Sequence, residues 1–275
     1  MTGSRYMWRA LSFYVFASIL ALFALVPFFW MISTSLKSKG ALFIIPIQWL
    51  PEQVSFEGYT KIFTLFPFAR AIFNSAFVSV ASTSITLLSA LMAAYVFAKL
   101  EFKGREVLFA LFLATMMVPG QVTTIPVFLV LKNLGLVNSF TGLLLPSIFN
   151  PFAIFMLRQF MKTVHSDFMD AAFMDGASHA GVFRRIMLPL SMPIIATLAV
   201  ITFMGVWNDY FWPLVILSDR EKMTLPLALS QLSGQYANEY NTLMAGSLIS
   251  MAPIILMYIF AQRYFKSGLQ LGGIK

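Results

Sequence analysis

Long uncharged apolar stretches separated by short polar segments run along the whole chain. Six of them contain no Asp, Glu, Lys or Arg and are 23 to 28 residues long: 10–36, 71–98, 107–131, 133–157, 186–208 and 240–262. A helix needs roughly 20 apolar residues to cross the ~30 Å of hydrocarbon in a bilayer. Because lipid offers no partner to free backbone N–H and C=O groups, each stretch is predicted to be a helix. The pattern predicts an all-α, polytopic membrane helix bundle with six transmembrane helices.

The first stretch has charged residues before it, as a signal peptide would. Arg5 and Arg9 precede an apolar run of 27 residues, 10–36. The apolar core of a signal peptide is about 7–15 residues long, and no small-x-small cleavage site ends this run. We therefore interpret it as a retained first span.

Composition supports a chain that mostly faces lipid. Hydrophobic residues make up 59% of it and charged residues only 11%, whereas a soluble domain carries about 25% charged residues. There is no cysteine, which excludes disulfides and thiolate metal sites, and the two histidines, His165 and His179, are too few for a histidine metal cluster. No metal site is therefore expected. The net charge of +8 could suggest a nucleic-acid partner, but none is expected, because the positions of the charges follow membrane topology.

The orientation follows from the distribution of the 19 Lys and Arg residues. With the N-terminus inside, twelve of them fall in the inside segments 1–9, 99–106, 158–185 and 263–275. This excess favours both termini in the cytoplasm. We expect a single transmembrane domain over 1–275, with long extracytoplasmic loops at 37–70 and 209–239 and a cytoplasmic loop at 158–189.

The cytoplasmic loop contains a well-specified short helix at about 167–175. Ser166 is a candidate N-cap, and Asp167 and Asp170 lie in the first turn, where the helix dipole favours negative charge. Gly176 supplies a C-terminal stop. Helical spacing places four residues on one face: Phe168, Ala171, Ala172 and Asp175.

A second short helix is predicted to start near Ser178 and to enter the fifth span with exposed apolar side chains: Val182, Phe183, Ile186 and Met187. The loop could lie flat on the lipid surface as an interfacial helix, but such helices usually carry Lys and Arg on the polar face. The first helix carries only acids. We therefore favour a docking helix for a soluble partner.

This loop resembles the "EAA" loop of binding-protein-dependent ABC transporter permeases, whose pattern is Glu-Ala-Ala-x-x-Asp-Gly-Ala, a gap, then Phe-x-x-Ile-x-Leu-Pro. The matching residues are Asp170, Ala171, Ala172, Phe173, Met174, Asp175, Gly176 and Ala177, followed by Phe183, Ile186, Leu188 and Pro189. The departure from the pattern is Asp170 in place of Glu, which keeps the charge and shortens its reach by one methylene.

Two further segments resemble the carbohydrate branch of that family. The stretch 207–214, Trp-Asn-Asp-Tyr-Phe-Trp-Pro-Leu, is similar to a segment of carbohydrate permeases, and the end at 262–275 is similar to the tail of the maltose-type subunit. The resemblance implies the ABC importer permease (MetI-like) fold, a place in a prokaryotic inner membrane, and translocation of a sugar or oligosaccharide by alternating access.

The resemblance also implies the partners. They are a second homologous permease subunit, two cytoplasmic ATP-binding subunits, an extracytoplasmic solute-binding protein, the sugar substrate and membrane lipid. The helix at 167–176 would sit in a groove of one ATPase subunit, with Phe168 and Phe173 as candidates for an apolar plug and Gly176 for the turn. The tail 268–275 would reach the ATPase dimer interface.

The chain is not expected to be an enzyme or to bind a cofactor. It has no G-x-x-x-x-G-K-[ST] loop to hold phosphates, so ATP and Mg²⁺ are expected in a partner subunit. Polar residues in or beside the spans are candidates for the translocation pathway: Gln121, Asn150, Asn208 and Asp209. Hydrogen bonds between helices would explain the first three equally well, and capping of the fifth span would explain Asp209.

Three alternatives remain. One is an ABC permease for glycerol phosphate or another polyol-type solute. Another is an ATP-independent secondary transporter, which usually needs a charged residue within the membrane; none of the six stretches contains one. The third is a membrane enzyme, for which no Ser/His/Asp or metal constellation is visible.

Overall fold

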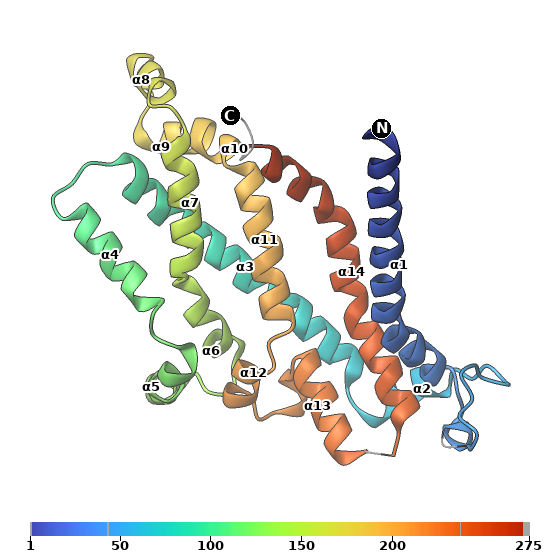
Figure 1. Cartoon of the computed structure of the whole chain (residues 1–275). Coiled ribbons are helices and arrows are strands. Elements are labelled where there is room, and N and C mark those ends of the chain that lie inside the picture. Colours follow the sequence, from blue (N-terminus) through green and yellow to red (C-terminus); the bar gives the residue numbers. More distant parts are fainter. Residues whose placement is uncertain (1, 43, 237, 272–275) are drawn as a thin grey trace. The chain divides into compact units, whose positions relative to one another are not determined.

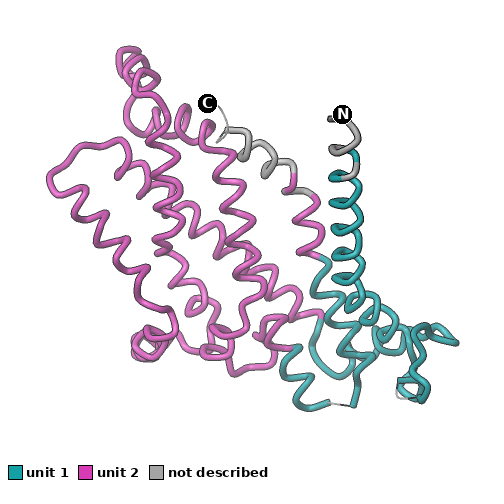
Figure 2. Tube along the Cα trace, viewed as in Figure 1, with its two compact units in different colours: residues 1–68, 229–252 teal, residues 69–228, 253–275 magenta. Residues whose placement is uncertain are grey.

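The computed structural model describes residues 2–42, 44–236 and 238–271, and throughout them the regular structure is helical (Figure 1). The predicted all-α fold is confirmed. The chain forms two compact units, residues 1–68 with 229–252 and residues 69–228 with 253–275 (Figure 2). The expectation of one transmembrane domain over 1–275 stays a prediction.

Unit 1 holds three elements from the N-terminal part of the chain: α1 (Thr2–Ser35), η1 (Lys39–Ala41) and α2 (Glu57–Leu65). Unit 2 holds most of the rest: α3 (Phe68–Lys99), α4 (Arg105–Thr115), α5 (Gly120–Asn133), α6 (Phe140–Leu144), η2 (Leu145–Ile148), α7 (Pro151–Thr163), α8 (Asp167–Met174), α9 (His179–Val182), the π-helix η3 (Phe183–Met187), α10 (Leu188–Leu190), α11 (Met192–Trp207), α12 (Phe211–Ile216) and η4 (Arg220–Lys222). One unit boundary falls after the first residue of α3, and the other two fall within α13 (Leu225–Gln235) and α14 (Tyr240–Leu271).

Four helical segments of the described chain are long and apolar enough to cross a membrane: Arg9–Ser35, Phe68–Lys99, Phe140–Thr163 and Tyr240–Ile259. The fourth predicted span, 133–157, is displaced toward the C-terminus. Gly135 and Asn138 have positive φ values of 69° and 57° and keep the preceding residues out of the helix. The helix then continues past Arg158, a residue predicted to lie in the cytoplasmic loop.

The predicted spans 107–131 and 186–208 are not single straight helices. The first is divided into α4 and α5, bent by 97°, and the second into the segment His179–Leu190 and α11, bent by 74°. Pro119 lies at the first break and Pro193 in the first turn of α11, and proline removes a backbone donor and clashes with the preceding turn. With 11 residues, α4 is about 16 Å long and cannot cross the bilayer alone. If each bent pair is counted as one span, the described chain has up to six candidate spans.

The core of unit 2 joins α3 and α7 to the elements of the predicted cytoplasmic loop. Ala90 and Ala94 of α3 are fully buried in the same cluster as Ala153 and Leu157 of α7. Small side chains four residues apart let helices approach closely. The cluster also contains Met169 of α8, so the helix of the predicted coupling loop packs on the same core as the long helices.

In unit 1, one carboxylate connects the two predicted extracytoplasmic loops. Glu239 accepts hydrogen bonds from Lys39 Nζ at 2.7 Å and Lys61 Nζ at 2.8 Å, and its side chain is only 10% exposed. The hydrogen bond from Lys39, followed by that from Lys61, holds the pKa of Glu239 below its ordinary value. The ion pairs therefore stabilise the fold above the unfolded-state pKa of about 4.3 and are lost as the pH falls through the lowered pKa.

We expect Glu239→Gln to remove this pH-dependent stabilisation. At pH 7 the variant should lose about 1 kcal/mol, or about 2–4 °C in Tm, because both lysines lose a charged partner while remaining partly exposed. Thermal unfolding in detergent from pH 7 to pH 3 measures the effect. The difference from wild type should shrink as Glu239 becomes protonated, and a difference that does not vary with pH would contradict the assignment.

Gly58 of α2 lies against the backbone of Asn241 in α14, within unit 1. An added Cβ would come within 2.8 Å of the Asn241 carbonyl oxygen and 2.9 Å of its carbon, and backbone cannot move aside as a side chain can. We expect Gly58→Ala to cost about 1–3 kcal/mol of stability, measured by thermal unfolding. Gly40→Ala is the matched control, because nothing lies within 4 Å of its added Cβ, and equal losses in the two variants would refute the close contact.

Candidate functional site

Helix α8 has the ends that its sequence specifies, except at its N-cap. Asp167 and Asp170 lie in its first turn, where the helix dipole favours them. Ser166 was expected to cap the helix, but its backbone has helical angles (φ −64°, ψ −31°) and its side chain makes no capping hydrogen bond. The prediction for Ser166 is wrong. A capping side chain needs extended backbone angles to reach the N–H groups.

Gly176 ends the helix in the left-handed conformation, with φ 79°. Its N–H donates to Phe173 O at 3.0 Å, and the Ala177 N–H donates to Ala172 O at 2.9 Å. These two bonds form a Schellman motif, which satisfies carbonyls that the helix end leaves free. The predicted stop at Gly176 is confirmed.

The inner face of α8 packs against its own chain. Met169 is buried, and Ala172 and Phe173 pack against the core of unit 2. The Phe173 ring lies edge-on to the His179 imidazole, with 4.9 Å between ring centroids. The buried face therefore has the spacing i, i+3, i+4, starting at Met169. The predicted face started one residue earlier, at Phe168.

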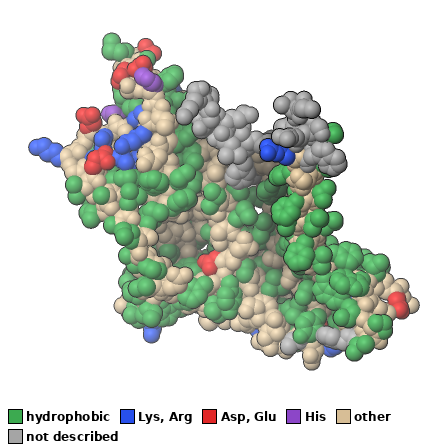
Figure 3. Space-filling model, viewed as in Figure 1, with side chains coloured by type: hydrophobic (Ala, Val, Ile, Leu, Met, Phe, Trp, Pro, Cys, Tyr) green, Lys and Arg blue, Asp and Glu red, His purple; other side chains and the backbone are tan. Residues whose placement is uncertain are grey.

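The outer face of α8 is solvent-exposed and both apolar and acidic. Phe168 is 56% exposed and Met174 88% exposed, beside the exposed Asp170, Ala171 and Asp175. Figure 3 shows apolar and acidic side chains together at the protruding end of unit 2 that α8 forms. The two predicted plug residues are therefore separated, because Phe168 points outward while Phe173 packs inward.

The second helix of the loop starts where expected but does not expose its apolar side chains. Ser178 accepts a hydrogen bond from the Gly181 N–H at 3.3 Å and so caps α9. Val182 and Met187 are completely buried, and Phe183 is half-buried against Tyr95 of α3, with ring centroids 5.3 Å apart. The predicted exposure of this helix is wrong, because its apolar face is covered by the core of unit 2.

The π-helix η3 precedes Pro189. The Leu188 N–H donates to Phe183 O, five residues earlier. Pro189 has no N–H to continue the α-helical ladder and its ring crowds the turn before it, which favours the wider π turn. The structure therefore places Phe183 and Pro189 of the predicted coupling loop in a bent connection to α11.

Arg158 was missed as a site residue. It lies on α7, is 3% exposed, and donates to both Glu106 carboxylate oxygens of α4, at 2.6 and 2.7 Å. Its Nε donates to Phe97 O of α3 at 3.1 Å, and its guanidinium lies 3.8 Å from the centroid of the Phe109 ring. The signal in the sequence is an arginine that directly follows the uncharged stretch 133–157. Through these contacts Arg158 joins α3, α4 and α7 near the predicted coupling loop.

A second cation anchors the loop itself. Lys99, the last residue of α3, donates to Val164 O at 2.7 Å, just before α8 begins. Together with Arg158, it links the segment that carries α8 to α3, α4 and α7.

The four predicted pathway residues do not converge. Gln121 is exposed on α5. Asn150 caps α7 by accepting from the Ala153 N–H at 3.0 Å, and Asn208 donates to Met204 O at 2.9 Å at the end of α11. Each of these two hydrogen bonds lies within the asparagine's own helix and not between helices, which was the predicted alternative.

Asp209 lies between α11 and α12 and is partly buried. It accepts a hydrogen bond from the Trp212 N–H at 3.2 Å. Burial raises the pKa of the Asp209 carboxyl above its ordinary value, and the backbone hydrogen bonds from Trp212 and Phe211 partly oppose that shift. With Ser147 and Trp212, Asp209 lines a small cavity of 50 Å³.

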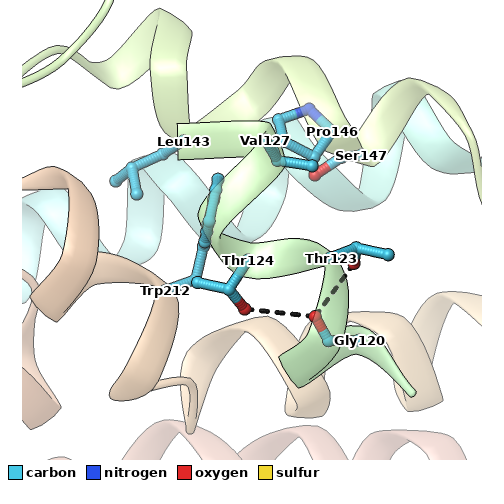
Figure 4. Close-up of a pocket in the computed structure, with 8 residues that line it drawn as sticks. All are labelled: Gly120, Thr123, Thr124, Val127, Leu143, Pro146, Ser147 and Trp212. Atoms are coloured by element: carbon cyan, nitrogen blue, oxygen red, sulfur yellow. Dashed lines mark hydrogen bonds between the residues drawn. The ribbon is translucent and has the colours of Figure 1, made fainter. Parts of the chain in front are cut away.

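A larger cavity of 280 Å³ adjoins these residues and was not predicted. Its lining comes from α5, α6, η2 and α12 (Figure 4): Gly120, Thr123, Thr124, Val127, Leu143, Pro146, Ser147 and Trp212. It shares Leu143, Ser147 and Trp212 with the smaller cavity. In unit 2, these elements lie at the end opposite to α8 (Figure 1).

Residues 85–270 match a family described as "Binding-protein-dependent transport system inner membrane component". The arabinooligosaccharides transport system permease protein AraQ of Bacillus subtilis (strain 168) is 37% identical over 264 residues, covering 95% of this chain and 94% of that protein. The inner membrane ABC transporter permease protein YcjP of Escherichia coli (strain K12) is 33% identical over 270 residues, covering 96% of each.

The fold has a close counterpart among solved structures. One chain from the crystal structure of a bacterial ABC transporter that imports the acidic polysaccharide alginate superposes with a TM-score of 0.86 at 26% identity. The match covers 96% of this chain and 99% of that one. The fold therefore agrees with the permease architecture over almost the whole length.

Proposed function

The chain belongs to the binding-protein-dependent transport system inner membrane component family, and on this premise we propose that it is a permease subunit of an ABC importer that translocates a sugar or oligosaccharide. The observation that carries the proposal is α8. It is a short acidic helix with a Schellman stop at Gly176, an inner face packed on the core, and an outer face that leaves Phe168 and Met174 uncovered.

The proposed partners are those that the resemblance to the family implies. The exposed face of α8 binds a groove of a cytoplasmic ATP-binding subunit, and two such subunits hold ATP and Mg²⁺. A second homologous permease subunit completes the pathway, and an extracytoplasmic solute-binding protein delivers the sugar. The complex lies in a prokaryotic inner membrane with α8 on the cytoplasmic side, and this chain itself is not catalytic.

Transport requires that ATP binding favour one of two conformations of the permease. A partner can shift such an equilibrium only by contacting the two states differently. Closure of the ATPase dimer would displace α8, and the hydrogen bonds of Lys99 and Arg158 would pass the displacement to α3, α4 and α7. The long helices then switch between inward-facing and outward-facing states.

The relatives favour a sugar over glycerol phosphate. The relative from Bacillus subtilis carries the name of an arabinooligosaccharide transporter, which supports the carbohydrate class.

Purification in mild detergent followed by identification of the retained proteins tests the proposal. We expect a second permease subunit and an ATPase that contains a phosphate-binding loop, together with ATP-dependent sugar uptake when the complex and its binding protein are reconstituted. Sugar uptake by the purified chain without any ATPase would instead support the secondary transporter.

A further inference from the structure

We propose that the 280 Å³ cavity of unit 2 is a contact site for one neutral sugar ring, so that this subunit touches the transported molecule itself. The inference rests on the proposed function and assigns a place to the substrate. The site would use Trp212 as its aromatic wall and the hydroxyls of Thr123, Thr124 and Ser147 as its polar groups.

The size of the cavity fits a small ligand. Small-molecule sites usually measure about 300–1,000 Å³, and this cavity, at 280 Å³, lies just below that range. It has room for a single ring of an oligosaccharide rather than for a whole chain. The remaining rings would extend beyond this subunit.

The lining offers both kinds of contact that a sugar needs. A sugar ring has a face of C–H groups, which packs on an aromatic face, and hydroxyls at its edge, which need donors and acceptors. Thr123 and Thr124 donate to the Gly120 carbonyl at 2.9 and 3.1 Å (Figure 4). Their oxygen lone pairs stay available to accept hydrogen bonds from a ligand.

Trp212 carries an unused donor. Its indole Nε1 is shielded from solvent and has no hydrogen-bond partner among the described residues. A buried donor without a partner costs about 1–3 kcal/mol, so such a group in a native structure calls for a ligand or a water. Trp212 lines both the 280 Å³ cavity and the 50 Å³ cavity beside it. Its Nε1 is shielded from both, so the ring would have to turn before the N–H could bind a ligand or a water.

The cavity adjoins a broken helix. The cavity lies at the break between α4 and α5, bent by 97°, where α5 begins at Gly120. Broken helices at membrane depth are tolerated where they are buried in protein or line a water-filled cavity, and transporters form substrate sites from them. No charged side chain lines the 280 Å³ cavity, which favours a neutral sugar over an acidic one.

The test measures sugar uptake and ATP hydrolysis together in proteoliposomes that contain the whole complex and saturating sugar-loaded binding protein. The probes are arabinotriose, lactose and maltose, and the best-transported one is used for the variants. We expect Trp212→Ala to lower uptake about tenfold through loss of the aromatic wall and the N–H donor. ATP hydrolysis stimulated by the binding protein should fall less than twofold, so the sugar carried per ATP decreases.

Two more conservative variants control for misfolding of Trp212→Ala. Trp212→Phe keeps an aromatic face and should lower uptake about threefold, and Thr123→Val, which removes a hydroxyl at nearly constant volume, should act similarly. Phe211→Ala is the matched control, because this neighbouring aromatic is 49% exposed and does not line the cavity. It should transport like wild type.

Two results would overturn the inference alone, and a third would also contradict the carbohydrate part of the proposed function. Uptake by Trp212→Ala within twofold of wild type would exclude the contact. Equal losses of uptake and ATP hydrolysis in all variants would assign the cavity a purely structural role. If the wild-type complex, with its ATPase bound, took up none of the neutral sugars, the carbohydrate part of the proposed function would fail, and this site with it.

Discussion

Replacement of Gly176 by valine is expected to abolish both ATPase association and sugar uptake while membrane insertion stays intact. Gly176 has φ 79°, a conformation that a β-branched residue rarely adopts. Nothing lies within 4 Å of an added Cβ, so the effect comes from the backbone and not from a clash. Strain of this kind costs about 1–3 kcal/mol, and relieving it would break the Schellman bonds that fix the end of α8.

Gly176→Asn is the matched control for this experiment. Asparagine is also larger than glycine, but it tolerates the left-handed conformation, so this variant should retain the ATPase and most of the uptake. Co-purification of the ATPase in mild detergent and uptake in proteoliposomes are measured for both variants. Normal co-purification of the valine variant would count against a docking role for the turn.

Phe168→Ala is expected to weaken ATPase binding about 30-fold without lowering the thermal stability of the isolated chain. Phe168 is 56% exposed on the outer face of α8, so its truncation leaves no cavity in the fold. An aromatic anchor at the centre of an interface contributes about 2 kcal/mol or more, which corresponds to about a 30-fold change in affinity. Titration of the purified ATPase subunit onto the chain in nanodiscs measures the loss.

Two further variants make this result specific. Thr163→Ala, an exposed change at the last residue of α7 and outside α8, should bind the ATPase normally. Phe173→Ala removes a ring packed on His179 and on the core, and should lower thermal stability. If Phe168→Ala bound the ATPase as well as Thr163→Ala does, the outer face of α8 would not be the docking surface.

The short helix and its stop were predictable because their determinants are local. Asp167 and Asp170 in a first turn and Gly176 at the end act within a few residues, and the structure has a helix at Asp167–Met174 with that stop. Which face of the helix packs inward depends on distant residues. Met169 and Phe173 face the core because α3 and α7 lie there, and periodicity alone could not separate packing in the chain from docking on a partner.

Six spans were predicted, and the described chain has four helices that qualify alone, or up to six if each bent pair is one span. Counting apolar residues measures length and not direction, so it could not give the bends of 97° and 74°, although prolines lie at both breaks. The cavity at Trp212 could not be predicted from the sequence. Its lining comes from segments around residues 120, 145 and 212, and only the fold brings them together.

The most direct test of the central claim is the side of the membrane on which α8 lies. The chain contains no cysteine, so Met174→Cys, at a position 88% exposed, introduces a unique thiol. We predict that a membrane-impermeant maleimide labels this thiol in inside-out vesicles, leaves it unlabelled in intact cells, and is blocked by bound ATPase. Labelling in intact cells would contradict a cytoplasmic α8 and with it the importer account.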